Sequence, residues 1–477
     1  MTGGERCPAE AVWLSVDRGA SQLSLYAHLH RYRKQRPRAY GRCTCAIAAL
    51  MVTIAGGCSN PKSTSDLSTS LRDRAGFEVP ATTATNGWQL PPNVNLGDGI
   101  SEDEAVATAL WNNAPFHAAL ADLGVARADL LQAGQLSNPN FSVLFPMGPK
   151  QAEFALTLPV EALWLRPRRM AIAKLNERKV AEQLVQRGLD LIRNVRVAFA
   201  DVTLAQDRVG LAQEALTIQT NIAHIARVRL EAGDASELES STARVDALRA
   251  REDVRTANDQ LVLARQRLAT LLGSATVAPG LKATAAEPVA VAPPELKPLV
   301  DRALGSRPDM RATELELEAA GKRAGLTTAE LLTLSVVLDA NEKDSGGFEL
   351  GPGLQFPIPI LHQNQAARAR ARAEIERAAW QTVAVRQQIQ SDVTGAHAEL
   401  VQAMEALSAW RREIMPPLDE MVEQTTRAYQ AGEVSLLAVH GATRERVTAT
   451  LRQAELAATV RRAQAELERS IGRKLEP

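Results

Sequence analysis

A short stretch that occurs twice constrains the fold of this chain more than any other feature. Leu230–Ser236 reappears as Tyr429–Ser435, and each copy joins two long, alanine-rich segments. The match continues to the end of each unit, where Leu272-Gly273 corresponds to Ile471-Gly472. Both separations, 432 − 233 and 472 − 273, equal 199. A gapless match of this kind indicates an internal duplication, so the chain should contain two similar halves.

Each copy of the repeated stretch is predicted to be the tip of a helical hairpin. Gly233 and Gly432 supply a backbone position that can leave right-handed helical geometry. Ser236 and Ser435 follow at the position where a side chain can cap the next helix. The two halves are therefore expected to be two similar hairpins.

The composition excludes some classes of partner. Lys plus Arg and Asp plus Glu each number 55, so no long-range field favours nucleic acid. Aromatic residues make up only 4% of the chain, and alanine is abundant. This composition favours thin, closely packed helices over a globular core with bulky side chains.

The N-terminal region has the features of an export signal over residues 1–57. A basic region at 31–42 is followed by Ala46–Gly57, a mostly apolar stretch that ends at Cys58. This stretch is shorter than the roughly 18–20 residues that span a bilayer, so it predicts a signal-peptide core. Residues 1–30 exceed an ordinary signal and are consistent with an over-long start. A short buried core segment is the alternative interpretation.

The end of this stretch resembles a bacterial lipobox, Ala55–Cys58, in which the cysteine is lipidated and becomes the mature N-terminus. Ser59 follows the cysteine, which by resemblance favours sorting to the outer membrane. All four cysteines lie in the first eighth of the chain, so neither a disulfide framework nor a thiolate metal site is expected in the main body. Residues 58–96, rich in Ser, Thr, Pro and Asn, are predicted to be a lipid-anchored tether.

The first structural repeat is expected at 97–273. The pair Ser101 and Glu104 predicts a capping box at the start of a helix that runs to about residue 135. A strand pair is predicted within 141–165. A helix of about 64 residues, 168–231, would be on the order of 95 Å long, and its return helix covers 235–272. A proline-rich linker, 274–298, should join the halves.

The second repeat, 299–472, shows the same order, followed by a tail at 473–477. We expect a helix at 306–331, strands at 335–338 and 350–361, a long helix at 364–430 and a return helix at 435–472. Prolines in the last strand predict an edge position, a bulge or the exit from the sheet. Pro416-Pro417 should kink the long helix.

This order of elements resembles the outer membrane efflux (TolC) family over Gly97–Gly472. The resemblance is carried by the two tips, Ser306–Asp309, Leu136–Asn140 and Phe356–Leu361. It implies a mainly α chain with a small β part, in the cell outer membrane of a Gram-negative bacterium and extending into the periplasm. It also implies a homotrimer whose four strands per subunit form one twelve-stranded β-barrel above a tunnel of long helices. Four short strands cannot close alone, and open sheet edges are not tolerated in lipid, so joint closure is also physically required.

The tips carry the functional hypothesis. In the family they meet a periplasmic adaptor protein and form the entrance, so the resemblance assigns adaptor docking to Gly233, Ser236, Gly432 and Ser435. Simple helix reversal is the alternative. Threefold symmetry would multiply the acids Asp234, Glu237, Glu239 and Glu433 into rings at the mouth that could favour cations. Solvated acids near helix N-termini are the alternative.

The sequence contains no catalytic constellation, so the chain is predicted not to be an enzyme and to need no cofactor or bound metal. The body histidines are scattered, without an HExxH pair. They are His117, His224, His362, His397 and His440.

The segment Phe356–Gln365 suggests a substrate. It resembles the Pro-Leu-Pro-Leu-Phe-x-x-Asn-Gln segment of the cobalt–zinc–cadmium branch of the family. That resemblance implies metal-cation efflux with an inner membrane resistance-nodulation-division transporter. Drug efflux and type I protein secretion are alternatives. A non-channel coiled-coil envelope scaffold is a further alternative, but it leaves the two matching strand pairs unexplained.

Overall fold

The computed structural model describes residues 68–69, 72–74, 76–77, 88–92, 94–95, 97–145, 152–284, 295–331, 333–342 and 347–475. The chain divides into two units, Met1–Pro61 and Lys62–Pro477. The predicted export signal and Cys58 lie outside the described residues. All that follows concerns the second unit.

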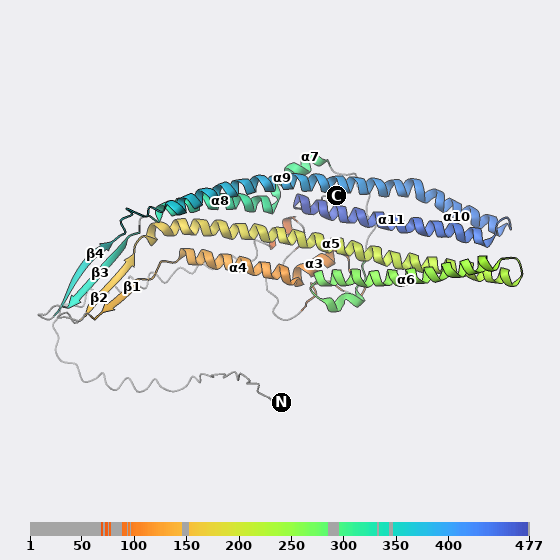
Figure 1. The fold of residues 1–477 in the computed structure, drawn as a ribbon, viewed down its shortest axis with the longest axis horizontal. Helices are drawn as coiled ribbons and strands as arrows, with labels where there is room; N and C mark the ends of the chain where they lie inside the picture. Colours follow the sequence, from red (N-terminus) through yellow and green to blue (C-terminus); the bar gives the residue numbers. More distant parts are fainter. Residues whose placement is uncertain are drawn as a thin grey trace, which may run out of the picture. The chain divides into compact units, whose positions relative to one another are not determined.

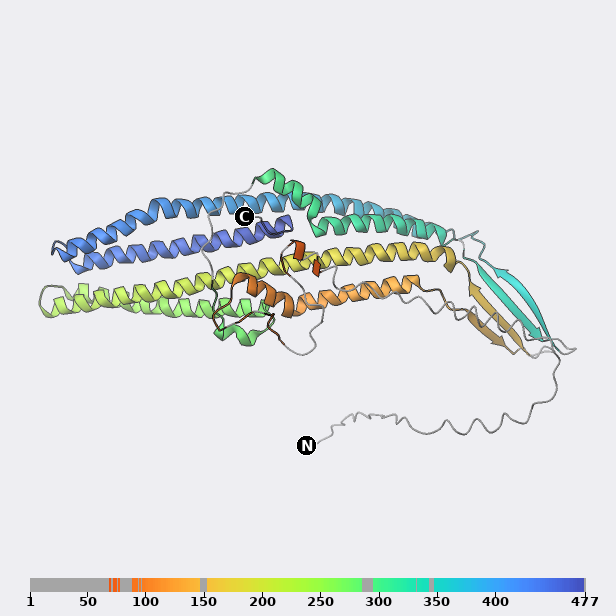
Figure 2. The same ribbon diagram turned by 180° about the vertical axis from the view of Figure 1, so that it is seen from behind.

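The second unit combines long helices with one four-stranded sheet (Figure 1). The α-helices are α3 (Glu102–Asn112), α4 (Ala114–Gly134), α5 (Ala162–Glu231), α6 (Glu237–Leu271), α7 (Leu296–Ser306), α8 (Pro308–Ala329), α9 (Gln365–Ala409), α10 (Met415–Gln430) and α11 (Leu436–Ile471). The strands are β1 (Asn140–Leu144), β2 (Glu153–Pro159), β3 (Ser335–Glu342) and β4 (Phe348–Gln355). A 3₁₀ helix, η1 (Ala275–Gly280), and a π-helix, η2 (Trp410–Ile414), complete the elements. Within this unit both views place the sheet at one end of the helices and the two reversals at the other (Figure 2).

The capping box predicted at Ser101 is confirmed, but the helix that it begins is shorter than expected. Ser101 caps α3, and the Glu104 side chain accepts a hydrogen bond from the Ser101 backbone at 2.8 Å. Instead of one helix to about residue 135, α3 ends at Asn112 and α4 begins at Ala114. Asn113 lies between them in an extended conformation and caps α4, with Pro115 in the first turn. Proline has no backbone N–H, and in the first turn of a helix that group has no partner within the helix. A proline there therefore favours the start of a new helix.

Helix α5 begins six residues before the predicted start at Arg168, with Pro167 inside it. The prediction began the helix after this proline, but Pro167 lies in the second turn, where the missing N–H removes only one ladder bond. The helix has 70 residues and is about 105 Å long. Apolar or small residues at a spacing of three or four along this helix predict one buried seam, and the positions from 184 to 205 confirm it. All seven are buried: Leu184, Gly188, Leu191, Val195, Ala198, Val202 and Ala205.

The four strands form one antiparallel sheet in the order β1-β2-β3-β4. Strands β1 and β4 are its two edges. Pro352 lies in edge strand β4, and β4 ends at Gln355, before Pro357 and Pro359. The prolines therefore mark both an edge strand and its exit, as predicted. The predicted strand, 350–361, was too long, because the chain leaves the sheet before Pro357 and Pro359.

The register of the sheet gives it one apolar and one polar face, because directly opposed residues share a face. The apolar face consists of Phe141, Val143, Phe154, Leu156, Leu158, Val336, Leu338, Ala340, Leu350, Pro352 and Leu354. The other face is the more polar one, with Ser142, Glu153, Thr157, Ser335, Asp339, Asn341, Glu349, Gly351, Gly353 and Gln355 beside the apolar Leu144, Ala155 and Val337. On the apolar face the rings of Phe141 and Phe154 stack with centroids 6.2 Å apart.

The second long helix is divided by η2, directly before Pro416-Pro417. Its buried seam matches that of α5 with an offset of 198, since Val195, Ala198 and Val202 correspond to Val393, Ala396 and Leu400. Beyond η2 the offset is 199, as at Gly233 and Gly432. A π turn accommodates one extra residue in a helix. The kink predicted at the prolines is therefore also a one-residue insertion in the second repeat.

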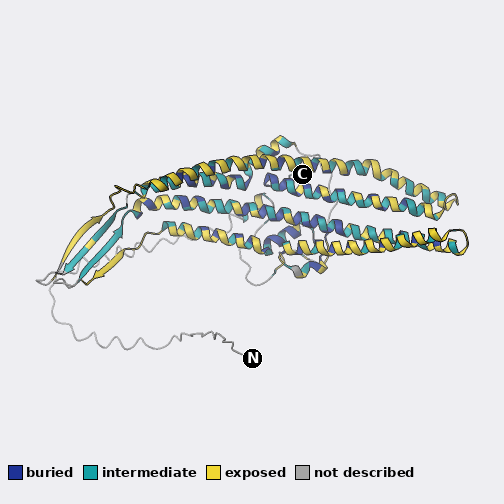
Figure 3. Cartoon of the chain, in the orientation of Figure 1, coloured by how far each residue is buried: buried dark blue, intermediate teal, exposed yellow. Residues whose placement is uncertain are grey.

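Each half has its own apolar core, seen as buried positions along the middle of the bundle (Figure 3). The first includes Leu110, Phe199 and Leu268, and the second includes Ile389 and Leu467. Between the halves, residues 274–298 contain η1 and the start of α7, and Ala283 forms a parallel bridge with Ile100. Described residues before 97 also contact the body: Trp88 Nε1 donates to the Leu272 carbonyl at 2.9 Å.

Among the residues that the structure describes, none of the helices is both long and apolar enough to cross a membrane.

Candidate functional site

The first tip is a compact reversal centred on Gly233. Its φ of +84° is favourable only for glycine, and Gly233 N donates to the Leu230 carbonyl at 3.0 Å. Asp234 N donates to the Arg229 carbonyl at 2.8 Å, which completes a Schellman-type helix end. Ser236 Oγ then accepts from Glu239 N at 3.1 Å and caps α6, as predicted.

The second tip repeats the reversal but not the cap. Gly432 has φ +77°, and its N–H donates to the Tyr429 carbonyl at 3.0 Å. Glu433 N donates to the Ala428 carbonyl at 2.9 Å. Ser435 has the extended backbone of a cap residue, but its side chain makes no capping hydrogen bond. The prediction of a cap at Ser435 is therefore correct for position and wrong for the side-chain bond.

The acids predicted to surround the mouth differ in their surroundings. Asp234, Glu237 and Glu433 are exposed beside the reversals. Glu239 instead forms an ion pair with Arg229 at 3.2 Å, and Arg229 also donates to the Asp234 carbonyl at 3.1 Å. The first tip therefore carries a fixed positive charge among its acids. The acidic rings remain a prediction.

Exposed apolar side chains lie beside these acids, and the sequence analysis did not single them out. Leu238 is 78% exposed, and Tyr429, Leu437 and Val434 are 42%, 41% and 36% exposed. They could have been recognised in the sequence, because they are apolar residues next to the turns and outside the buried seam. Glycine backbone, exposed apolar groups and a few charges together make a surface suited to contact with another protein.

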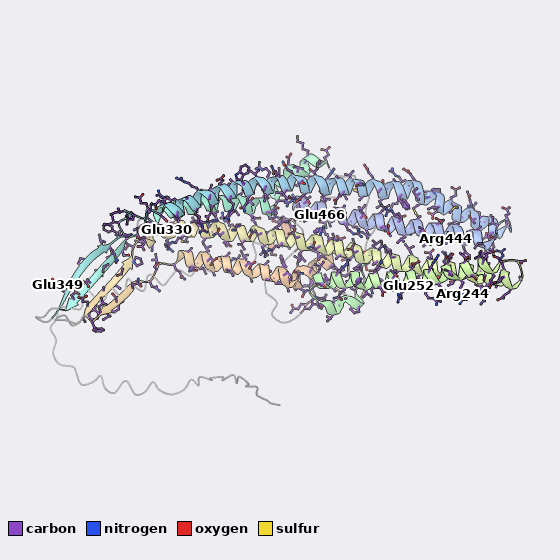
Figure 4. The ribbon with its side chains drawn as sticks, viewed as in Figure 1. Arg244, Glu252, Glu330, Glu349, Arg444 and Glu466 are labelled. Carbon is purple, nitrogen blue, oxygen red and sulfur yellow. The ribbon has the colours of Figure 1, made fainter. Side chains whose placement is uncertain are left out.

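Ion pairs between the long helices hold the two hairpins in register. Pairs that link α5 to α11 are Asp190–Arg469 at 2.9 Å, Arg193–Glu466 at 2.6 Å, Asp201–Arg462 at 2.9 Å and Arg208–Glu455 at 3.0 Å. Because the residue numbers rise on one helix as they fall on the other, the helices run antiparallel. Glu466, labelled in Figure 4, lies in the middle of this row.

Two buried arginines strengthen this central region. Arg196, 8% exposed, pairs with the buried Glu468 and with Glu102 at 3.1 Å. Burial raises the pKa of Glu102, while the charge of Arg196 opposes this rise. The sequence analysis missed Arg196, which sits among the apolar positions of the α5 seam.

The second buried arginine, Arg307, explains the Ser306–Asp309 motif. Its side chain, 2% exposed, binds Asp309 at 2.6 Å and Asp392 at 3.0 Å. It also donates to the Ser470 carbonyl at 3.2 Å. Arg307 thereby joins the start of α8 to the middle of α9 and to the end of α11.

The histidines and acids of the described chain do not gather into a metal site, since no group of three His, Cys, Asp or Glu residues there could hold a metal ion. His117 Nε2 lies 2.8 Å from the Trp111 carbonyl. Burial lowers the pKa of His440 near the second tip. The tips, the row of ion pairs and the two-faced sheet are therefore the features to which function can be assigned.

Comparison with known proteins gives consistent results. Residues 299–473 match the family model "Outer membrane efflux protein". The chain is 23% identical over 384 residues to the cobalt-zinc-cadmium resistance protein CzcC of Cupriavidus metallidurans, covering 78% of this chain and 90% of that protein.

Solved structures share the fold. The CmeC outer membrane channel of Campylobacter jejuni superposes with a TM-score of 0.65 and 13% identity, over 84% of this chain and 95% of that one. CusC gives a TM-score of 0.62 and 19% identity, over 83% and 99% of the two chains. The chain is therefore similar to the outer membrane efflux protein family over its second half, and it shares its fold with solved outer membrane channels over most of its length.

Proposed function

We propose that three copies of this chain form a passive exit duct through the outer membrane and periplasm, and that its cargo is heavy-metal cations. The two-faced sheet carries the proposal. Its apolar face suits lipid and its polar face suits an aqueous lumen. Its edges, β1 and β4, are free to pair with neighbouring copies, which removes edges that lipid would not tolerate.

The proposed partners act at the two tips. A periplasmic adaptor protein would dock on the glycine reversals and the exposed Leu238 and Tyr429, and an inner membrane transporter of the resistance-nodulation-division type would deliver cargo. The absence of a side-chain bond at Ser435 leaves its hydroxyl available to a partner, whereas Ser236 is engaged in capping. Docking at Gly233, Ser236, Gly432 and Ser435 is supported by their position at the ends of the hairpins.

The metal cargo is supported by the likeness to a cobalt-zinc-cadmium resistance protein and by the Phe356–Gln365 segment. The exposed acids Asp234, Glu237 and Glu433 would favour cations at the mouth. Deleting the gene should lower tolerance to zinc, cadmium or cobalt. Unchanged metal tolerance with new drug sensitivity would instead favour drug efflux.

Reconstitution tests the duct itself. The purified protein should have the mass of a trimer and should give discrete conductance steps in planar bilayers. A monomer or dimer that never conducts, even after Glu239 and Glu433 are neutralised, would favour the scaffold alternative.

A double variant tests docking. Gly233→Asp with Gly432→Asp should abolish efflux while trimers persist, because each change places a side chain and a charge on the docking surface. Gly210→Asp is the matched control, since Gly210 lies on the exposed side of α5 with open space at its Cα. Normal export by the double variant would refute the docking role.

A further inference from the structure

The ends of the two long helices nearest the sheet share an unusual charge pattern. The first eight residues of α5 contain Arg166, Arg168 and Arg169, and the first eight of α9 contain Arg368, Arg370 and Arg372. Neither segment contains an acid, although the chain as a whole has equal numbers of basic and acidic residues. We call these six residues the arginine collar.

The collar is not explained by helix stability. Acids are the residues that the helix dipole favours in the first turn, and the first turns of α5 and α9 contain none. Helices α3 and α6, which begin far from the sheet, follow that rule with Glu102, Asp103, Glu104, Glu237 and Glu239 in their first turns. Among the described helices, only α5 and α9 have three arginines and no acid in their first eight residues, and this excess of positive charge points to an anionic partner outside the chain.

The guanidinium groups are held in place by bonds that leave their charge intact. Arg166 Nε donates to the Gly134 carbonyl at 2.6 Å, and Arg168 Nη1 donates to the Gly325 carbonyl at 3.2 Å. Arg368 Nη2 donates to the Gln363 carbonyl at 2.9 Å. In these three arginines a main-chain carbonyl uses one donor, and the other donors remain for a ligand. Arg370 differs, because it pairs with Glu374 at 3.0 Å.

The starts of α5 and α9 lie at a similar level along the bundle, because both are tied to the end of α8. Arg168 binds the Gly325 carbonyl, and Asn364, just before α9, donates to the Thr327 carbonyl at 3.1 Å. The collar therefore forms one band beneath the sheet.

Exposed apolar residues separate this band from the sheet. Leu163 and Trp164 are 66% and 37% exposed at the start of α5. On the strand β4 side, Phe356, Ile358, Ile360 and Leu361 are 59%, 71%, 73% and 92% exposed. Moving from the sheet toward the helices, the surface passes from apolar strands through this apolar segment to arginines. A lipid leaflet has the same order of hydrocarbon, interface and headgroup.

From this order we infer that the arginine collar binds the phosphate headgroups of anionic phospholipids in the leaflet beside the helices. The inference rests on the proposed function, because it requires the sheet to lie in the membrane. Arg166 and Arg169 lie about 6 to 11 Å along α5 from its start, and the headgroup region beyond the hydrocarbon is roughly 5 to 8 Å thick. Guanidinium groups bind phosphate oxygens in a bidentate manner, and basic residues at a membrane surface are attracted to anionic lipid.

Trp164 provides a reporter for the test. The full-length protein is reconstituted into vesicles that contain brominated phosphatidylglycerol or brominated phosphatidylcholine, both of which quench tryptophan. Because the chain has six tryptophans, the fluorescence of Trp164 is obtained by subtracting the spectrum of the Trp164→Phe variant from that of the protein. We expect brominated phosphatidylglycerol to quench this signal about threefold more effectively, with the preference falling as salt rises.

Matched variants separate charge from folding. Arg166→Gln, Arg168→Gln and Arg368→Gln together should lower the preference at least twofold, because glutamine retains a donor for the carbonyls but has no charge. The variant with lysine at the same three positions should keep most of the preference for phosphatidylglycerol, because lysine retains the positive charge. Arg244→Gln, Arg249→Gln and Arg251→Gln together form the control on α6, where Arg244 lies far from the sheet (Figure 4), and they should change nothing.

Two results would overturn the inference in distinguishable ways. Equal quenching by both lipids would show that the sheet is inserted but that the collar does not select anionic lipid, which would be the case if the arginines faced the lumen. No quenching by either lipid would show that Trp164 lies away from lipid, and the proposed function would fail together with the collar.

Discussion

Replacing Arg307 by methionine tests whether a single buried guanidinium holds the second repeat together. The variant removes the cation that Asp309 and Asp392 share, so that Asp392 keeps only the longer pair with Arg469 at 3.6 Å, and it leaves the Ser470 carbonyl without its donor. Removing one partner of a buried ion pair lowers the free energy of unfolding by about 3 to 5 kcal/mol. We expect a loss of that size for Arg307→Met, since the side chain is 2% exposed and binds two carboxylates.

The measurement is guanidinium-induced unfolding of the detergent-solubilised protein, followed by far-ultraviolet circular dichroism. Arg311→Met is the matched control, because Arg311 lies one turn further along α8, is 55% exposed and pairs with Glu314 at 2.9 Å. An exposed pair of this kind contributes about 1 kcal/mol or less. Adding Asp309→Asn and Asp392→Asn to the Arg307 variant should recover most of the loss, because no unpaired charge then remains. Equal losses for Arg307→Met and Arg311→Met would refute the reasoning.

Other consequences of the structure can be checked by the same unfolding assay. Ser236→Ala should cost about 1 kcal/mol through its lost cap, whereas Ser435→Ala should cost only a few tenths, since its side chain makes no capping bond; equal effects would contradict the difference between the tips. Gly233→Ala should cost about 1 to 2 kcal/mol from its positive φ alone. Gly273→Ala should cost more, because its Cβ would overlap the Asn112 carbonyl oxygen, and a smaller cost would argue against that contact. Hydrogen bonds from Ser101 lower the pKa of Glu104, so its contribution is present above the ordinary value of 4.5 and is lost as pH falls through the lowered pKa. The deficit of Glu104→Ala should therefore narrow in acid, and a deficit that is constant with pH would contradict this assignment.

The sequence predicted the features that depend on local pattern. Glycine followed by serine identified both tips, and the alternation around Phe141 identified a strand, because those signals are set by a few neighbouring residues. The start of α5 was missed because a proline near a helix start is tolerated when the preceding strand already leads into helical geometry. No local rule reveals the pairing of Arg229 with Glu239 across the first turn.

The central ion pairs were beyond sequence reasoning for a different reason. Asp190 and Arg469 are separated by 279 residues, and only the antiparallel packing of the two hairpins brings them together. The arginine of the Ser306–Asp309 motif was visible in the sequence, but its partner Asp392 was not. Long-range polar contacts depend on how whole helices are rotated and aligned against each other. The periodic apolar pattern of a sequence predicts that alignment only to within about one helical turn.

The π turn at Trp410–Ile414 makes the long helices of the two duplicated halves unequal, because only the second contains the extra residue. One extra residue in an α-helix would turn everything beyond it by about 100°. Here the π turn accommodates the extra residue, and Trp410 Nε1 within it donates to the Ala449 carbonyl of α11 at 3.1 Å. Three copies arranged around an axis would therefore present six hairpin ends of two kinds in alternation. Three would lie at the end of the uninterrupted helix α5, and three at the end of the long helix that η2 interrupts. A partner that contacts all six must recognise two different surfaces, and a hybrid chain built from two first halves would lose that distinction.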